Sequence, residues 1–408
     1  MASKQTMPMT PSTEKPPYPL VGFWAALRMV TQLWTTLISN LRPLTTLEQA
    51  VPLWPPTAPL MAWLTRVCLA PWQRWDTIYY IWIATRGYAV HDGTAQFHPL
   101  YPWTATPLIK IGLPPILALL TVNSLAVILL ISIVYRLARL DLAPSTARTA
   151  VLLLLCNPFA FALFIPYAEP LFLLFAALCL YYARRKQWWI AGGAGALATL
   201  TRQQGLFLLA PLAWELWENA GRRWRVSFAA WRDWLALALI PAGYLVWIVY
   251  RALALNDLAV DFTSLHALIY SFLISPSAVK VVPVQTFLWP WQALYLAIIQ
   301  LWRAPDVDLI VNLVGGGYFL LMTAWAWPRL RPSNRWYVAL IILVSFGYHT
   351  GATHPYMGLL RHLFLAFPVF LGLAPRAEKP SRKLGWIITG LLGLFFLLLL
   401  YSLEAWIP

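Results

Sequence analysis

Long apolar stretches recur along the chain, and short polar connections between them hold most of its charged residues. A helix that crosses a bilayer needs about 20 mostly apolar residues, and fewer when neighbouring helices or a thinned bilayer help. The pattern therefore predicts an all-α, polytopic integral membrane protein with about eleven transmembrane helices. The predicted spans cover residues 20–41, 115–137, 147–164, 168–183, 188–201, 205–218, 234–252, 308–327, 335–350, 359–374 and 384–403.

The composition supports a membrane protein. The chain has 408 residues, of which 60% are hydrophobic and only 11% are charged, and its mean hydropathy is +0.63. Soluble domains carry about 25% charged residues, so this charge cannot cover a soluble surface. The 24 tryptophans fit two membrane interfaces, where aromatic rings gather. The three cysteines lack paired or CxxC spacing, which predicts neither a disulfide framework nor a structural zinc site.

The net charge of +15 is interpreted as a topology signal. Lys and Arg accumulate on cytoplasmic loops, and basic residues cluster in every second predicted connection, as at 184–186, 222–225 and 329–335. This places the N-terminus inside and the C-terminus outside. Because the clusters are short and separate, nucleic-acid binding is disfavoured.

The ends of the chain give a simple domain organisation. Residues 1–19 are polar and predict a disordered cytoplasmic tail without a removed signal peptide. Residues 20–408 are expected to form a single transmembrane domain. The lack of targeting signals and glycosylation-rich loops favours a bacterial plasma membrane.

Two predicted external connections, 42–114 and 253–307, are too long to be simple links. Both are rich in Trp, Tyr and Pro, which indicates ordered interfacial structure, and we expect them to roof an active site on the outer face. The apolar segment 285–303 is placed on the outer surface as an interfacial helix, because counting it as a span would invert all later basic loops.

The first external connection contains an aromatic helix with a single acid. Helical spacing places Trp75, Tyr79 and Trp82 on one apolar face, and Gly87 marks its predicted end. Asp76 stands in the first turn, where the helix dipole favours an anion. As the sole acid of this helix, at the outer membrane surface, Asp76 is a candidate functional residue. The alternative is that Asp76 only caps the helix.

Several short motifs follow one another across residues 70–370. They are Trp75-Asp76 with Tyr80 and Gly87-Tyr88, Pro99-Leu100-Tyr101-Pro102, Asn157-Pro158-Phe159, Tyr167-Ala168-Glu169-Pro170, Thr201-Arg202 with Gly205, and Arg361 before Ala366-Phe367-Pro368. In this order and spacing, the chain resembles the PIG-V-type mannosyltransferases, which belong to the GT-C class of membrane glycosyltransferases. It departs from that pattern at His98, where an aromatic residue is usual, and at Gln203-Gln204.

The resemblance implies an inverting glycosyltransferase that moves a sugar, mannose in this family, from a polyprenyl-phosphate donor to an acceptor hydroxyl on the outer face. The acceptor is expected to be a glycan, a glycolipid or a protein, with membrane lipids around the site. Transfer needs a carboxylate to accept the hydroxyl proton and cations to neutralise the departing phosphate. The resemblance places Asp76 as the base. A donor held in the bilayer needs no nucleotide-binding fingerprint.

Three further charged residues are predicted to bind substrate. Glu169, beside Tyr167 in a very short external turn, is expected to contact the sugar or the acceptor, although a turn carboxylate can also be merely solvated. Arg202 interrupts an apolar stretch, where ionisable residues are usually functional, and its guanidinium suits a donor phosphate. An ion pair or a helix-break cap is the alternative. Arg361 could bind phosphate likewise or could simply snorkel to the interface.

The remaining predicted substrate contacts are Trp75, Tyr79, His98, Tyr101, Tyr167 and His354. For His98, interfacial packing is the alternative. His349 and His354 flank a polar break expected to line the outer cavity, but their spacing of five does not suit a metal pair on one helical face. Asp306 and Asp308 could form a cation pair, but they begin a predicted span, where acids cap helices. No metal is therefore predicted as a site component, and a divalent cation is left open.

Two other functions are compatible with the sequence. A transporter or flippase for lipid-linked saccharides would show repeated halves and polar sites on broken helices, and only the Arg202 region suggests that. A catalytically silent partner in a larger complex is a third possibility. Gly315-Gly316-Gly317 lies inside an apolar span and predicts close helix packing instead of a phosphate-binding loop.

Overall fold

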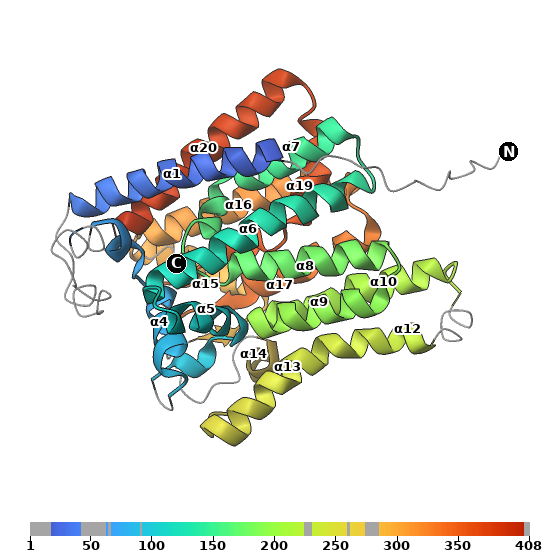
Figure 1. The fold of residues 1–408 in the computed structure, drawn as a ribbon, viewed down its shortest axis with the longest axis horizontal. Helices are drawn as coiled ribbons and strands as arrows, with labels where there is room; N and C mark the ends of the chain where they lie inside the picture. The colour runs from blue at the N-terminus through green and yellow to red at the C-terminus, as the bar shows by residue number, and fades with distance from the viewer. Residues whose placement is uncertain are drawn as a thin grey trace.

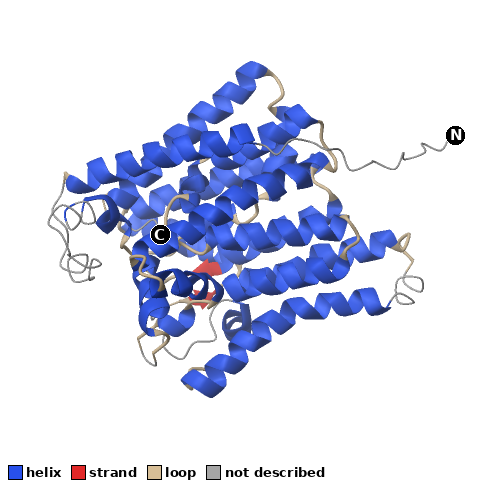
Figure 2. Cartoon of the chain, in the orientation of Figure 1, coloured by secondary structure: helices blue, strands red, loops and turns tan. Residues whose placement is uncertain are grey.

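The computed structural model describes residues 18–41, 63, 67–89, 92–223, 231–258, 262–273 and 285–403. These residues are almost entirely helical (Figure 1), and the two short strands among them are drawn in red in Figure 2. The predicted all-α fold class is therefore confirmed. Most of the predicted tail and the first part of the connection 42–114 lie outside the described residues.

The first half of the described chain is a series of helices with short 3-10 segments between them. Its elements are α1 (Tyr18–Asn40), η1 (Ala70–Trp72), α4 (Asp76–Arg86), η2 (Thr94–Gln96), α5 (Leu100–Lys110), α6 (Pro115–Arg139), α7 (Pro144–Leu155), η3 (Pro158–Leu163), α8 (Glu169–Arg184), α9 (Trp188–Thr201), η4 (Gln203–Leu208) and α10 (Leu209–Asn219).

The second half adds the paired strands. Its elements are α12 (Trp231–Leu235), η5 (Ala236–Ala238), α13 (Leu239–Tyr250), the π-helical η6 (Arg251–Leu255), α14 (Leu265–Leu273), β1 (Thr286–Phe287), α15 (Pro290–Arg303), α16 (Val307–Ala326), η7 (Trp327–Arg329), α17 (Pro332–Gly347), β2 (Tyr348–His349), α18 (Leu359–Phe364), α19 (Pro368–Leu373), η8 (Ala374–Arg376) and α20 (Pro380–Ser402).

Four helical stretches of the described chain are long and apolar enough to cross a membrane by themselves. They cover residues 115–139, 231–255, 307–329 and 380–402. The count of eleven spans thus stays a prediction, because several predicted spans are shorter or broken helices. The predicted segment 285–303 contains a 14-residue helix, α15.

Two predicted spans end earlier than the apolar pattern indicated. The span 147–164 was wrong in its second half, because α7 stops at Leu155. Pro158 has no N–H to continue the helix, and the Asn157 side chain donates to the carbonyls of Leu153 (3.0 Å) and Leu154 (2.7 Å), which ties off the helix end. The span 359–374 is likewise two short helices, α18 and α19.

Close helix approaches depend on residues without side chains. In Figure 1, α1 and α20 lie side by side at one edge, and α20 also crosses η3. A Cβ atom at Gly390 of α20 would stand 1.9 Å from the Cys156 carbonyl oxygen, so only glycine permits this crossing. The predicted packing at Gly315 and Gly316 is confirmed, since both face Leu359 or Leu360 of α18, whereas Gly317 has open space around it.

The two-stranded sheet links the second long connection to the end of α17. β1 and β2 are antiparallel, with Thr286 opposite His349 and Phe287 opposite Tyr348. Gly347 allows this contact, because a Cβ there would stand 2.7 Å from the Leu288 carbonyl oxygen. The segment 285–288 is thereby fixed beside the start of the polar break at 350–354.

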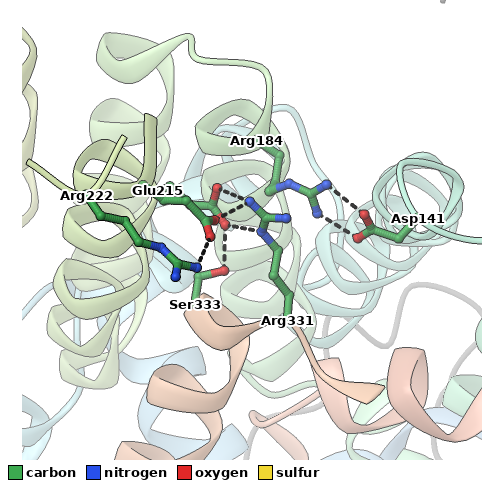
Figure 3. Close-up of polar contacts among 7 residues, drawn as sticks. Asp141, Arg184, Glu215, Arg222, Arg331 and Ser333 are labelled. Atoms are coloured by element: carbon green, nitrogen blue, oxygen red, sulfur yellow. Dashed lines mark hydrogen bonds and ion pairs between the residues drawn. The ribbon is translucent and has the colours of Figure 1, made fainter. Parts of the chain in front are cut away.

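Helix α8 connects two polar clusters. Its 16 residues span about 22 Å at 1.5 Å per residue. At its C-terminal end, Arg184 binds Asp141 through two bonds of 2.7 and 2.8 Å, and Arg331 binds Glu215 at 2.6 Å (Figure 3). Basic residues from loops predicted to share one membrane side therefore gather at this end of the molecule. The other end of α8 begins at Glu169.

Candidate active site

Asp76 is the first residue of α4, and its side chain bonds an arginine instead of capping the helix. The N-cap residue is Trp75, whose φ of 53° is rare for a bulky residue and turns the chain sharply into the helix. The capping alternative does not fit, because Trp75 and not Asp76 is the N-cap residue of this helix. Its Oδ2 atom instead accepts a hydrogen bond from Nη1 of Arg361, 285 residues away in sequence.

Arg361 sits between two carboxylates. It comes from the short helix α18, and its Nη1 atom also lies 3.6 Å from Oε1 of Glu169. Its guanidinium carbon is 5.0 Å from the centre of the Tyr167 ring, within cation–π distance. The side chain is only 11% exposed, so the snorkelling alternative for Arg361 does not fit its position.

Glu169 and Arg202 form the second ion pair of the site. Nη1 of Arg202 donates to Oε1 of Glu169 at 2.6 Å, and the Glu169 side chain is fully buried. The solvated alternative for Glu169 is therefore wrong. Arg202 reaches this position because α9 ends at Thr201 and the chain becomes extended for one residue before η4.

The turn after Arg202 is set by Gly205. A Cβ atom there would lie 2.4 Å from the backbone nitrogen of Thr199, so the chain can fold back on α9 only with glycine. The Gly205 amide donates to the Arg202 carbonyl at 3.0 Å, which closes the turn. The sequence motif Thr201-Arg202 with Gly205 is thus a turn that aims one guanidinium at Glu169.

The four charged residues alternate in sign, from Asp76 through Arg361 and Glu169 to Arg202. Their formal charges cancel, and this pairing offsets the desolvation cost of burying them. Within the described chain, three buried polar atoms of these residues have no hydrogen-bond partner: Nε of Arg202, Nε of Arg361 and Oε2 of Glu169. Asp76 is the most exposed of the four, at 20%, and within the described chain its Oδ1 atom has no hydrogen-bond partner.

Aromatic side chains form the wall beside this cluster. Tyr80 lies one turn after Asp76 and packs edge-on against Tyr101 (4.9 Å) and Tyr167 (6.5 Å between ring centres). Burial, and next the Asp76 charge, raises the pKa of Tyr80 above its ordinary range. The Tyr167 hydroxyl is buried, and none of the residues that the structure describes forms a hydrogen bond with it.

The predicted aromatic contacts differ in burial, and they are either fully or partly buried. Tyr101 is fully buried and donates to the Leu119 carbonyl at 3.1 Å, so it supports the wall from behind. Tyr79 is less buried, and its ring stacks on Phe97 at 4.8 Å. Burial, and next Asp76, raises the pKa of Tyr79. Trp75 is partly buried against the core.

His98 holds two segments together. Its Nδ1 atom is 2.7 Å from the Thr199 carbonyl oxygen, and its Nε2 atom is 3.5 Å from Oε1 of Gln203. Burial lowers the pKa of His98 to about 3, so the ring is neutral and donates its Nδ1–H to Thr199. The packing alternative for His98 fits these contacts, and the ring positions the Arg202 turn from the first external connection.

His354 lies beside two acidic residues, and the sequence did not predict that the three would be neighbours. Its Nδ1 atom lies 3.3 Å from Oδ2 of Asp306 and 3.4 Å from Oδ2 of Asp308. The predicted capping role of Asp306 is confirmed, because its side chain accepts from the Asp308 backbone nitrogen. The pairing across 46 residues was not foreseen.

Two residues beside the site were not predicted from the sequence. Tyr80 belongs to a sequence motif but was not among the predicted substrate contacts, although Tyr80 and not Tyr79 faces Tyr101 and Tyr167. Tyr348 packs its ring against His362, the residue after Arg361, at 5.4 Å. A helical projection that placed Tyr80 one turn from Asp76 could have found the first. The second depends on pairing of β1 with β2, which has no sequence signal.

Comparisons with known proteins find one matching family model and similar solved structures. Residues 96–247 match the family model described as dolichyl-phosphate-mannose-protein mannosyltransferase. Among solved structures, the chain is similar to ArnT from Cupriavidus metallidurans bound to undecaprenyl phosphate, with a TM-score of 0.51 and 14% identity over 91% of this chain. This likeness shows the fold. The chain spans 63% of the length of ArnT.

A second solved structure is more distant. The apo oligosaccharyltransferase from Archaeoglobus fulgidus gives a TM-score of 0.46 and 12% identity, covering 95% of this chain and 56% of that one. No curated protein matches the sequence.

Proposed function

We propose that this protein is an inverting membrane glycosyltransferase that transfers a sugar from a polyprenyl-phosphate donor to an acceptor hydroxyl, with Asp76 as the base. The observation that carries the proposal is the state of the Asp76 carboxylate. One oxygen is bound by Arg361, while the other has no partner in the described chain and the side chain is 20% exposed. An incoming hydroxyl can reach that oxygen.

The chemistry follows from this geometry. The acceptor oxygen attacks the anomeric carbon while its proton passes to Oδ1 of Asp76, and the bond between that carbon and the phosphate oxygen breaks. The polyprenyl phosphate leaves with the bonding electron pair, so the anomeric centre inverts. Arg361 binds Oδ2 of Asp76 and so fixes the rotamer of the carboxylate, which leaves Oδ1 for the acceptor proton.

Cations beside the base suit a departing phosphate. The two guanidiniums of Arg202 and Arg361 use Nη1 for the carboxylates, and both keep an Nε donor without a partner. A guanidinium can bind phosphate oxygens while keeping one carboxylate contact, because it has five donors. Arg202 is the proposed donor-phosphate contact, and Glu169 holds it and contacts the sugar or the acceptor.

The sugar and the membrane side are finer parts of the proposal. We propose mannose, as in PIG-V-type enzymes, with a glycan, glycolipid or protein acceptor. The matched mannosyltransferase model and the undecaprenyl phosphate of the ArnT structure support a polyprenyl-phosphate donor. The site is proposed to face the outside of a bacterial plasma membrane, opposite the basic loops at the far end of α8. The long connections 42–114 and 253–307 are proposed as its roof.

The test is a transfer assay with purified protein. Polyprenyl-phosphate mannose and glucose are supplied with candidate acceptors, and nucleotide sugars serve as the comparison donors. Arg202→Lys keeps a positive charge near Glu169 but loses the planar fork. It should raise the KM for the lipid donor about tenfold with little change in the acceptor KM. Arg222→Gln, at the far end of the molecule, is the matched control.

Two results would contradict the proposal. The first is transfer from nucleotide sugars but from no polyprenyl-phosphate sugar. The second is an Arg202→Lys enzyme whose donor dependence equals that of wild type, which would remove Arg202 from the phosphate site.

A further inference from the structure

Two carboxylates and one imidazole converge where α16 begins. Asp306 and Asp308 belong to the first turn of this 20-residue helix, and His354 belongs to the segment that leads into α18. One ligand atom from each of the three residues lies within 4.8 Å of the others. They come from two segments, so the arrangement is a product of the fold and not of a local motif.

Each carboxylate divides its two oxygens between two tasks. Oδ1 of Asp306 accepts from the Asp308 backbone nitrogen, and Oδ1 of Asp308 accepts from Nδ2 of Asn312 at 3.0 Å. Both Oδ2 atoms turn to the Nδ1 atom of His354, at 3.3 and 3.4 Å. The local bonds therefore orient the two carboxylates, and each leaves one oxygen facing the same point.

Helix capping does not account for this arrangement. Capping and the helix dipole explain why Asp306 and Asp308 stand in a first turn. They do not explain why Asp308, with only 6% of its side chain exposed, is buried beside a second carboxylate. Within the described chain, neither acid has a Lys or Arg at ion-pair distance. Two carboxylates so close repel each other when both are ionised, and a cation between them removes that repulsion.

We propose that Asp306, Asp308 and His354 bind one divalent cation of the Zn²⁺ or Mn²⁺ type. One imidazole nitrogen with two carboxylate oxygens is a donor set typical of these ions, and water would complete the coordination. Ca²⁺ is disfavoured because it takes six to eight oxygen ligands. A protonated His354 paired with the two acids is the alternative that the test must separate.

The cation would act on the fold and not on the transfer chemistry. His354 lies seven residues before Arg361, and α16 packs directly against α18. A cation at this point would therefore hold the segment 350–358 to the start of α16 and so restrict the position of α18. The three residues are positioning residues for Arg361, and the site is independent of which sugar the protein transfers.

The test measures metal binding on the full chain in detergent. After treatment with EDTA, the protein is titrated with Zn²⁺, Mn²⁺ and Ca²⁺, and the bound metal and the melting temperature are recorded. Wild type should bind one Zn²⁺ or Mn²⁺ per chain and melt at a higher temperature with the metal. His354→Gln and Asp308→Asn should each weaken binding at least about tenfold. Asp141→Asn, an exposed carboxylate at the far end of α8, should bind as wild type does.

His354→Gln keeps the test valid if Asp308→Asn does not fold, because His354 is 25% exposed and tolerates substitution better. The proposal is overturned if wild type binds neither Zn²⁺ nor Mn²⁺ at millimolar concentration, or if His354→Gln binds either ion as tightly as wild type. Equal affinity for Ca²⁺ would also overturn it.

Discussion

The buried pair between Glu169 and Arg202 gives the sharpest stability prediction. Glu169→Gln keeps the shape of the side chain but removes the negative charge that lies 2.6 Å from Arg202 and 3.6 Å from Arg361. Breaking a buried ion pair costs about 3–5 kcal/mol, since the remaining charge is left uncompensated. Arg361 keeps Asp76, and Arg202 is 12% exposed and can partly hydrate. We therefore expect a loss near the lower limit, about 3 kcal/mol.

The assay is thermal unfolding of purified protein in detergent. For a chain of this length, 1 kcal/mol corresponds to roughly 1–2 °C, so Glu169→Gln should lower the melting temperature by about 3–6 °C. Arg86→Gln is the matched control, because its pair with Asp92 is equally short at 2.7 Å but half exposed, and such pairs contribute less than about 1 kcal/mol.

A double substitution separates the pair from its surroundings. In Glu169→Gln/Arg202→Gln, no unpaired charge remains, so the combined loss should be smaller than the sum of the two single losses by at least about 1 kcal/mol. A Glu169→Gln protein that melts with the Arg86→Gln control would refute the reasoning. Strictly additive single and double losses would refute it as well.

Three further predictions concern residues around this pair. Burial lowers the pKa of His98 from 6.5 to about 3, so below pH 6.5 the unfolded chain takes up a proton that the folded protein does not bind. This uptake lowers the free energy of unfolding progressively as pH falls from 6.5 toward 3, and the loss is absent above pH 6.5. Unfolding titrations should show about 2 kcal/mol of this loss between pH 7 and 5, absent in His98→Asn; an unchanged slope in the variant would exclude His98. Gly205→Ala places a Cβ 2.4 Å from the Thr199 nitrogen and should lower both the melting temperature and the rate of sugar transfer. Gly193→Ala, with open space around it, should leave both unchanged. Equal behaviour of the two variants would contradict the role of the Gly205 turn in placing Arg202. Tyr167→Phe removes a buried hydroxyl without a partner and should change stability by less than about 0.5 kcal/mol in thermal unfolding, so a large loss would mean that the hydroxyl is bonded.

Much of the site could be predicted from the sequence, because its charged residues interrupt apolar or aromatic stretches. Asp76, Glu169, Arg202 and Arg361 stand out for that reason, since charge is costly near or within the bilayer. Their pairing could not be predicted. The contact between Asp76 and Arg361 joins residues 285 apart, and Arg361 comes from α18, a short helix that the apolar pattern merged with α19 into one span.

The misplaced helix ends have a common physical cause. Hydropathy reports how apolar a segment is, but α7 ends where the Asn157 side chain donates to its last carbonyls and Pro158 has no N–H to continue the helix. The convergence of His354 on Asp306 was missed for a related reason. Spacing arguments compare residues on one helix, whereas these two come from separate segments that only the packing of α16 against α18 brings together.

The central claim is that Asp76 removes the proton from the acceptor hydroxyl. The most direct test is the rate of sugar transfer by Asp76→Asn in vesicles supplied with polyprenyl-phosphate sugar, beside Asp92→Asn, which neutralises another carboxylate of the same connection that is also paired with an arginine. A general base contributes about 10²–10⁴ to the rate, so Asp76→Asn should lose at least about a hundredfold. Its melting temperature should fall by no more than the roughly 3–6 °C expected for Glu169→Gln, because Arg361 keeps Glu169 at 3.6 Å. Asp92→Asn should transfer at close to the wild-type rate. A folded Asp76→Asn protein that transfers sugar as fast as Asp92→Asn would contradict the account.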